Sequence, residues 1–463
     1  MTTETPPSVP GQQRPAPASA AGMPALPPGG PGFVPPPPGG RPSMRRALEV
    51  FENRDYRFLW LSSLFSFMGM QMQQVARAIL AWDLTHSFGA TGMIMLSFGL
   101  PMLLLSLFGG AIADRLNKKD LSVYTQIGIG LLALITAILI VTDLMTFQIL
   151  FGLGLVQGTF FAIGMPARQP LLALVVDPNQ LMSAMAMGNA AMNGTRLIAP
   201  AVAGPLIFWG GVEAAYFVMA VFYLVSVVTL FAVPRIHGRP MQGGRGSVTQ
   251  EIGQGLSYVV HDRTLHYLLL MGFTSALFAM PYIALLPGFV ERDLGMDRAN
   301  VSYLLVATGV GALVGSLLIA MFTEHPHKPL FQFGAGQLSA LGLVLLGVIS
   351  VSAGFTGAMI AIAFLGLTLT TFQTLNMTMV MASARREYYG RVMSIMMITF
   401  STMPMMSAPL GFIADRIGAP SLFIAQGVAV AIMITLISLG NMSYVLSPEP
   451  ERVEEEPAPT SAG

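Results

Sequence analysis

Long apolar segments alternate with short polar turns over most of the chain. Between about residues 45 and 446, windows of about 20 predominantly apolar residues recur, which is the length that an α-helix needs to cross a bilayer. We count twelve such windows and predict an all-α membrane protein with twelve transmembrane helices. The predicted spans are 58–81, 89–112, 121–142, 147–167, 186–208, 214–233, 266–289, 301–322, 330–350, 355–381, 392–413 and 420–444.

The longest polar interruption, residues 234–264, leaves six spans on each side. Two halves of nearly equal length are typical of transporters built from parallel repeats, in which substrate binds between the halves near the midplane. We therefore predict two six-helix bundles, 45–233 and 265–446, joined by a cytoplasmic linker, 234–264. The Pro/Gly-rich segment 1–44 and the acidic segment 447–463 are expected to be disordered tails.

The distribution of Lys and Arg predicts the orientation. With the twelve predicted spans, 19 of the 24 basic residues fall on the side that holds the N-terminus and three on the opposite side. The remaining two, Arg77 and Arg196, lie within spans. Because basic residues concentrate in cytoplasmic loops, both termini are expected in the cytoplasm.

Composition excludes several function classes. The chain is 53% hydrophobic with a net charge of +1 and no cysteine. No basic tract suggests nucleic acid, and disulfides or thiolate metal sites are ruled out. The sequence has neither a P-loop nor H-E-x-x-H, and its six histidines fall in loops or at span ends, so neither ATP-driven transport nor a membrane enzyme is expected.

The 33 methionines raise one metal alternative. They are dense at 393–406, where thioethers could bind Cu(I). Adaptable apolar packing is the favoured interpretation. No cofactor or metal is predicted.

Charge gathers in one turn after the second span, within "GGAIADRLNKKDL" (109–121). A shorter echo, "GFIADRIGAP", lies at 411–420. In the predicted topology Asp114 is at the inner face and Asp415 at the outer face, so the two cannot be equivalent positions of a six-helix repeat. The echo is interpreted as a capped, solvated turn.

"GAIADRLNKK" resembles the G-x-x-x-D-R-x-G-R/K-R/K signature of the major facilitator superfamily. Residues 55–69, 81–92, 166–189 and 390–397 resemble the bacterial enterobactin-exporter-like and macrolide-efflux-like branch. Asn117 replaces the usual glycine, a mild departure because asparagine also tolerates the left-handed conformation. The segment "TRLIAPAVAGPLI" resembles the antiporter G-P-x-x-G-G motif, with two glycines replaced by alanine. The resemblance implies a multi-pass protein of the bacterial inner membrane.

The signature implies a gate at the inner face. In the superfamily its aspartate is thought to meet the positive N-terminal end of the eleventh span, which would latch the two halves. Arg115, Lys118 and Lys119 would hold nearby carboxylates and lipid phosphates, although anchoring alone could explain these basic residues. The residues of the predicted gate are Gly110, Asp114, Arg115, Lys118, Lys119 and Arg391.

Polar side chains within spans are candidates for the substrate cavity. Asn189, Asn193 and Arg196 are spaced along one helical face, where they would either bind a ligand or hydrogen-bond between helices. The Gln and Asn side chains suit a neutral or weakly charged amphipathic substrate. The full set of candidates is Gln71, Gln74, Arg77, Gln157, Asn189, Asn193, Arg196, Gln373 and Asn376.

Energy coupling has few candidates because no carboxylate lies in the middle of a span. Asp83, which could also pair with Arg77, and Asp114 are the coupling candidates. The sequence favours a monomeric exporter of small amphipathic compounds, drug or siderophore-like, that works by alternating access with proton antiport. The alternative is an importer or facilitator of a nutrient or metabolite. The expected partners are the substrate, protons and membrane lipid.

Overall fold

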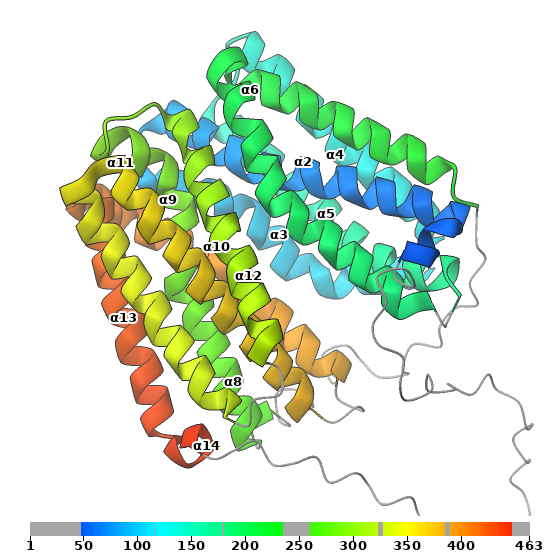
Figure 1. The fold of residues 1–463 in the computed structure, drawn as a ribbon. Coiled ribbons are helices and arrows are strands. Elements are labelled where there is room, and N and C mark those ends of the chain that lie inside the picture. The colour runs from blue at the N-terminus through cyan, green and yellow to red at the C-terminus, as the bar shows by residue number, and fades with distance from the viewer. Residues whose placement is uncertain are drawn as a thin grey trace, which may run out of the picture. The chain divides into compact units, whose positions relative to one another are not determined.

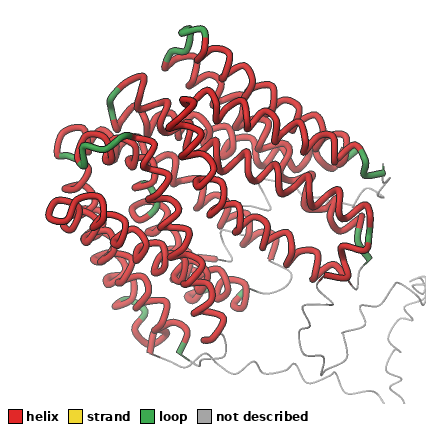
Figure 2. Tube along the Cα trace, turned by 45° about the horizontal axis from the view of Figure 1, so that its top comes forward, coloured by secondary structure: helices red, strands yellow, loops and turns green. Residues whose placement is uncertain are grey.

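The computed structural model describes residues 48–115, 117–177, 180–234, 259–260, 262–322, 327–384 and 389–446. All of them belong to one compact unit that begins at Met44. Every regular element among these residues is helical (Figure 2). The predicted tails and nearly all of the predicted linker lie outside the described residues.

The N-terminal half, residues 48–234, begins with a short 3₁₀ turn and continues with long helices (Figure 1). Its elements are η1 (Val50–Glu52), α2 (Arg54–Thr85), α3 (Phe88–Arg115), α4 (Lys118–Val141), α5 (Phe147–Val175) and α6 (Leu181–Phe231).

The C-terminal half, residues 259–446, begins with a helix that two π-helical turns interrupt. Its elements are α8 (Arg263–Thr274), η3 (Ser275–Ala279), α9 (Tyr282–Gly288), η4 (Phe289–Asp293), η5 (Arg298–Asn300), α10 (Val301–Phe322), α11 (Lys328–Ser383), α12 (Tyr389–Ile417), α13 (Ala419–Leu439) and α14 (Met442–Leu446).

Polar caps define where several helices start. The side chains of Asn53, Asn117, Thr146 and Asp262 each accept backbone N–H groups in the first turn of the helix that follows. Asn117 has φ −64° and ψ 120°, so it is extended and does not use the left-handed conformation that asparagine tolerates. Asparagine suits this position because its carbonyl oxygen caps α4.

Two glycines break the longest helices. Gly211, with φ 73°, interrupts α6, and Gly354, with φ 59°, interrupts α11. Positive φ is accessible to glycine at little cost, so these residues let the chain reverse direction between the predicted spans on either side.

All twelve predicted spans fall largely on helices, although residues 280–281 and 440–441 interrupt spans 266–289 and 420–444. Within the described residues, eight helical segments are long and apolar enough to cross a membrane, and the segments on α6 and α11 each contain one of the two breaks. The helices α2 and α12, which hold predicted spans 58–81 and 392–413, are not among the eight. Polar residues such as Arg77 lower the hydropathy of α2.

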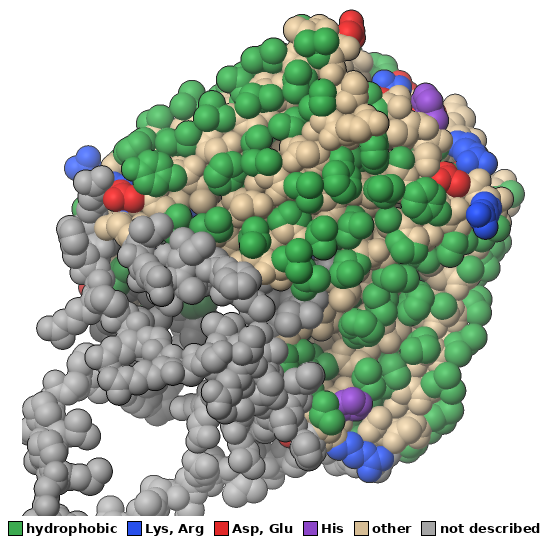
Figure 3. Space-filling view, turned by 180° about the vertical axis from the view of Figure 1, so that it is seen from behind, with side chains coloured by type: hydrophobic (Ala, Val, Ile, Leu, Met, Phe, Trp, Pro, Cys, Tyr) green, Lys and Arg blue, Asp and Glu red, His purple; other side chains and the backbone are tan. Residues whose placement is uncertain are grey.

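The two halves have separate buried apolar clusters. One cluster consists of residues between 72 and 223 together with Ala299, and the other of residues from 259 to 445 together with Trp82 and Phe88. Many large apolar side chains are exposed, and in Figure 3 they cover much of the surface while charged side chains gather towards its edges. An apolar surface of this extent is what a bilayer requires.

Candidate functional site

The two halves contact each other where α3 begins and α12 ends. Asp415 on α12 accepts hydrogen bonds from the backbone N–H groups of Phe88 (2.7 Å) and Gly89 (3.0 Å) and from the hydroxyl of Ser87 (2.7 Å). A carboxylate is well placed at a helix N-terminus, where unpaired N–H groups and the helix dipole both favour negative charge. The interpretation of the echo as a solvated turn is therefore wrong, because Asp415 joins the halves.

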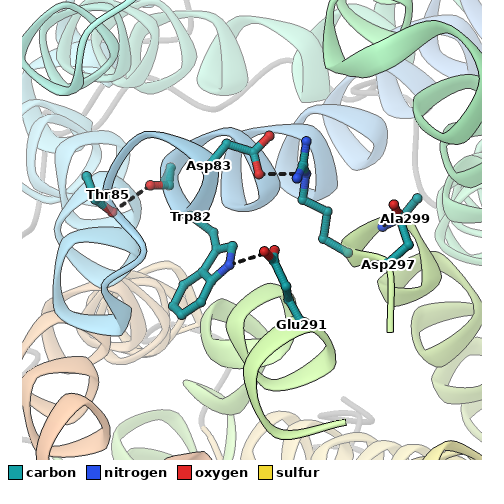
Figure 4. Close-up of polar contacts among 8 residues, drawn as sticks. Trp82, Asp83, Thr85, Glu291, Asp297 and Ala299 are labelled. Carbon is teal, nitrogen blue, oxygen red and sulfur yellow. Dashed lines mark hydrogen bonds and ion pairs between the residues drawn. The ribbon is translucent and has the colours of Figure 1, made fainter. Parts of the chain in front are cut away.

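Two further polar contacts join the halves nearby (Figure 4). Asp83 at the end of α2 pairs with Arg298 of η5, with 2.6 Å between Oδ1 and Nε. The indole Nε1 of Trp82 donates to Glu291 Oε2 at 2.9 Å. The expected pairing of Asp83 with Arg77 is not formed, because Arg77 bonds to a glutamine instead. We call these contacts of Asp415, Asp83 and Trp82 the outer contact, after its position in the predicted topology.

Burial controls the charge of Asp83. This carboxyl lies beyond residue 81, where the predicted span ends, and its side chain is 19% exposed. Burial raises the pKa of Asp83 to about 6, and the neighbouring Arg298 offsets only part of that effect. The residue is therefore partly protonated near pH 6 while the outer contact is closed.

Glycines allow α3 and α12 to pack closely beside the polar groups. A Cβ atom at Gly92 would collide with the backbone of Ser407 and Ala408, and one at Gly411 would collide with the carbonyl of Phe88. Further along, Gly99 faces the ring of Pro404. Because residue numbers rise along α3 as they fall along α12, the two helices are antiparallel.

Arg77 lies in a buried network inside the N-terminal half. Its guanidinium donates to Gln157 Oε1, and Gln157 Nε2 donates to Gln73 Oε1. The ring of Phe98 lies 5.2 Å from the guanidinium carbon. Arg77 is 6% exposed, so the structure places Arg77 and Gln157 in helix packing. The candidates Gln71 and Gln74 bond to each other on the more exposed side of α2.

Three candidates lie along one face of α6, and we call them the α6 stripe. Asn189, Asn193 and Arg196 are all exposed. Near the same helix is a cavity of about 160 Å³, to which α2, α5 and α6 contribute. Asn189 lines it together with Arg168, a residue that sequence reasoning did not select because it falls just beyond a predicted span. The signal that could have found Arg168 is a basic residue on a helix that continues past the apolar window.

The candidates in the C-terminal half lie on α11. Asn376 is buried and accepts a hydrogen bond of 2.6 Å from Gln332 Nε2, while Gln373 Nε2 lies 3.3 Å from the sulfur of Met280. Gln332, which the sequence analysis did not select, is therefore the partner that buries Asn376. The two candidates are not brought together with the α6 stripe by any hydrogen bond among the described residues.

The predicted inner gate is described only in part. Gly110, Asp114 and Arg115 lie near the end of α3 and Arg391 near the start of α12, and their side chains lie outside the described residues.

Lys118 and Lys119 open α4. The ammonium of Lys119 donates to the carbonyl oxygens of Phe231 (3.0 Å) and Val233. Lys119 therefore caps the end of α6, and its expected contact with carboxylates or lipid phosphates stays a prediction.

Comparison with known proteins identifies the family. Residues 46–457 match the family model described as transmembrane secretion effector, a branch of the major facilitator superfamily. The chain belongs to this family. A transmembrane secretion effector is a membrane transporter, and the resemblance inferred from the sequence motifs is confirmed.

Two of the similar proteins are named for efflux or export and a third is named as a transporter. The chain is 22% identical over 407 residues to macrolide efflux protein A of Streptococcus pyogenes, which covers 84% of this chain and 98% of the relative. It is 23% identical to the enterobactin exporter EntS of Shigella flexneri, over 73% of this chain and 79% of the relative. The staphyloferrin A transporter of Staphylococcus aureus is also 23% identical, over 82% and 94%.

Solved structures share the fold of the transmembrane secretion effector. A mutant of the nucleoside transporter NupG superposes with a TM-score of 0.69 at 10% identity, covering 84% of this chain and 99% of the other. A POT family transporter superposes with a TM-score of 0.65 at 11% identity, covering 84% and 96%. These superpositions show the major facilitator fold, and the family model and the relatives support efflux by a secondary transporter.

Proposed function

We propose that this protein exports small amphipathic compounds across the bacterial inner membrane by alternating access, with twelve spans in two six-helix bundles, 45–233 and 265–446, and both termini in the cytoplasm. The outer contact carries the proposal. It must break whenever the outer side opens, so its strength sets the balance between the two conformations. The separate apolar clusters of the halves support their movement as two bodies.

The inner gate is proposed as the counterpart of the outer contact. Asp114 follows Phe88 by 26 residues on α3, and Tyr389 precedes Asp415 by 26 residues on α12. Because the helices are antiparallel, Asp114 would reach the N-terminus of α12 at the opposite end of the same pair. Each "ADR" segment would then latch one side of the membrane, and only one latch would be closed at a time.

Proton coupling is proposed to pass through Asp83. When the outer side opens, Asp83 becomes solvated and its pKa returns towards the ordinary value of about 3.9. The closed outer contact therefore binds the proton more tightly than the open one. A proton taken up from outside lowers the cost of burying Asp83 again, so the return to the inward-facing state carries the proton inwards.

A transport assay in everted membrane vesicles tests the function. A fluorescent amphipath should accumulate in vesicles that contain the protein when their interior is acidic, because the interior corresponds to the outside of the cell. Collapse of the pH gradient should stop accumulation beyond equilibrium. Net movement out of everted vesicles would contradict export, and accumulation that is insensitive to the gradient would contradict proton antiport.

A further inference from the structure

Fixed charge inside the N-terminal half is unbalanced. Arg77, Arg168 and Arg196 lie on α2, α5 and α6, whereas the acidic residues of these three helices lie near helix ends or at the α6 break. An arginine in the middle of a membrane helix costs roughly 2.5–3.5 kcal/mol on insertion scales, so each needs a partner or access to water. Three positive charges without carboxylates indicate a region of positive potential.

Two of the three arginines have neutral partners. Arg77 is enclosed by Gln157 and the ring of Phe98, as described above. Arg168 donates to the hydroxyls of Ser66 (2.8 Å) and Ser62 (3.4 Å), and the ring of Phe67 lies 5.7 Å from its guanidinium carbon. These contacts hold the guanidinium of Arg168 in place but leave its charge unneutralised.

Arg196 is the accessible member. It is exposed, and among the described residues it forms no hydrogen bond or ion pair. If the only role of Arg196 were to join two helices, it would need a hydrogen bond or an ion pair to the neighbouring helix. Its role as interhelical glue is therefore not supported by the part of the chain that the structure describes.

The neighbours of Arg196 on α6 show which way it faces. Ala199 and Ala203 belong to the buried cluster of the N-terminal half, and Leu197 packs against Gly309 of α10 in the C-terminal half. The opposite side of the helix carries exposed apolar residues such as Ile198. At 100° per residue, Arg196 lies between the face packed on its own half and the face packed on α10. It therefore lies at the edge of the face that packs on its own half, next to the face that contacts α10.

The cavity beside α2, α5 and α6 has the matching chemistry. Its wall combines Arg168 and Asn189 with the aromatic rings of Trp60 and Phe67 and with methionine side chains. Asn189 and Arg196 are seven residues apart on one face, which corresponds to about 10 Å along the helix. The α6 stripe thus extends from the cavity that contains Arg168 and aromatic rings to the guanidinium of Arg196.

From this arrangement we infer that the exported molecules are amphipathic organic anions, in which a carboxylate or a similar acidic group binds Arg196 or Arg168 at successive points of the path and the apolar body lies against the cavity wall. The inference rests on the proposed export function and sharpens its substrate class from neutral or weakly charged to anionic. An anion in this site gains charge-assisted hydrogen bonds in a region of low dielectric, where bidentate guanidinium pairs are strongest.

A matched set of probes tests the charge preference. Purified protein in vesicles is given a fluorescent amphipathic carboxylate, its neutral amide and an amine analogue of the same size. The carboxylate should be transported with an apparent affinity at least about tenfold higher than that of the amide, as expected for a hydrogen bond to a charged group. A preference for the amine or equal affinity for all three would overturn the inference. Transport of none of the three would instead count against the export function.

Substitutions of Arg196 test whether the preference for the carboxylate arises from the α6 stripe. Arg196→Gln should lose about tenfold in affinity for the carboxylate and leave the amide unchanged, while Arg196→Lys should retain part of the preference. Arg263→Gln is the matched control, because Arg263 is an exposed arginine that bonds to Asn441 and Gly440 near the ends of α13 and α14. Equal losses for the carboxylate and the amide in Arg196→Gln would contradict a charge-specific role.

Binding provides a readout that does not depend on transport. The carboxylate should quench the fluorescence of Trp60, and this quenching should be lost in Arg168→Gln. The variant Trp60→Phe shows which part of the fluorescence signal comes from the cavity. Vesicles of phosphatidylcholine alone and vesicles containing phosphatidylglycerol separate two sources of the anion. If anionic lipid competes with the carboxylate and neither is transported, the site is a lipid headgroup site and the inference is wrong.

Discussion

Single carboxylates control the contact between the halves. Asp415 and Asp83 both lie at helix ends of the predicted outer side, yet their surroundings differ. Asp415 accepts three hydrogen bonds, from Ser87, Phe88 and Gly89. Asp83 is paired with Arg298 on one side only, and burial raises its pKa to about 6. Asp415 is therefore suited to hold the two halves together through its three hydrogen bonds, and Asp83 to respond to pH.

The pH response of Asp83 has a defined sign. Because the closed outer contact has the higher pKa, acid favours closure, and the advantage is lost as the pH rises through about 6. Between pH 5 and pH 7, the open fraction should rise by about tenfold while Asp83 stays ionised in the open state. Asp83→Asn, which resembles the protonated form, should remove this dependence and stay closed at pH 7.

A cysteine reporter measures the opening. The sequence contains no cysteine, and Ser407, on α12 at the contact with Gly92, is 1% exposed. A Ser407→Cys thiol should react with a membrane-impermeant maleimide only when the outer contact opens. The reactivity of a thiol itself changes with pH. The labelling rate of Ser407→Cys is therefore divided by that of Met296→Cys, a position that is 38% exposed. A normalised rate that falls from pH 5 to pH 7, or an unchanged dependence in Asp83→Asn, would contradict the assignment.

Helix pairs transmit these local contacts because their surfaces fit closely. Along α3 and α12, small residues bring the backbones into direct contact, so a shift at one end of either helix has to move the other. The sequence predicted the helices through their apolar windows and also the break between 208 and 214. It could not predict which glycines face a neighbouring helix, because Gly92 and Gly152 are both small residues in apolar windows and differ only in their tertiary neighbours.

Gly92 and Gly152 therefore form a matched pair for a packing test. A Cβ atom at Gly92 would collide with the backbone of Ser407, whereas one at Gly152 on α5 has no heavy atom within 4 Å. Gly92→Ala should destabilise the closed form by about 1–3 kcal/mol through overpacking, and Gly152→Ala should be neutral or slightly stabilising. Thermal unfolding in detergent and the transport rate measure both effects. Equal effects of the two substitutions would show that the α3–α12 contact is not tight.

At the scale of the whole molecule, the sequence predicted the class of the elements better than their partners. The apolar windows and the "ADR" signature were sufficient for an all-helical transporter of the major facilitator superfamily, and the family match confirms it. The meaning of Asp415 was missed because its partners, residues 87–89, lie more than 320 positions away in the sequence. Backbone N–H groups at a helix start carry no residue-type signal that would mark them as partners.

The two "ADR" segments should act against each other if each latches one side. Asp415→Ala removes a helix-capping carboxylate, which typically costs about 1 kcal/mol, so the outward-open fraction and the labelling of Ser407→Cys should rise by about fivefold. Asp114→Ala should lower the labelling, because loss of the proposed inner latch favours the inward-open state. Since the two sites are at opposite ends of the α3–α12 pair, their free-energy effects should add, and the double variant should label at nearly the wild-type rate. Glu213→Ala, at the α6 break within the N-terminal half, is the control for removal of a carboxylate and should leave the labelling unchanged. If Asp114→Ala raised the labelling or left it unchanged, the reciprocal arrangement would be wrong, even if Asp415 proved to hold the outer side closed. The "ADR" segment at residues 113–115 would then serve only as a positively charged anchor.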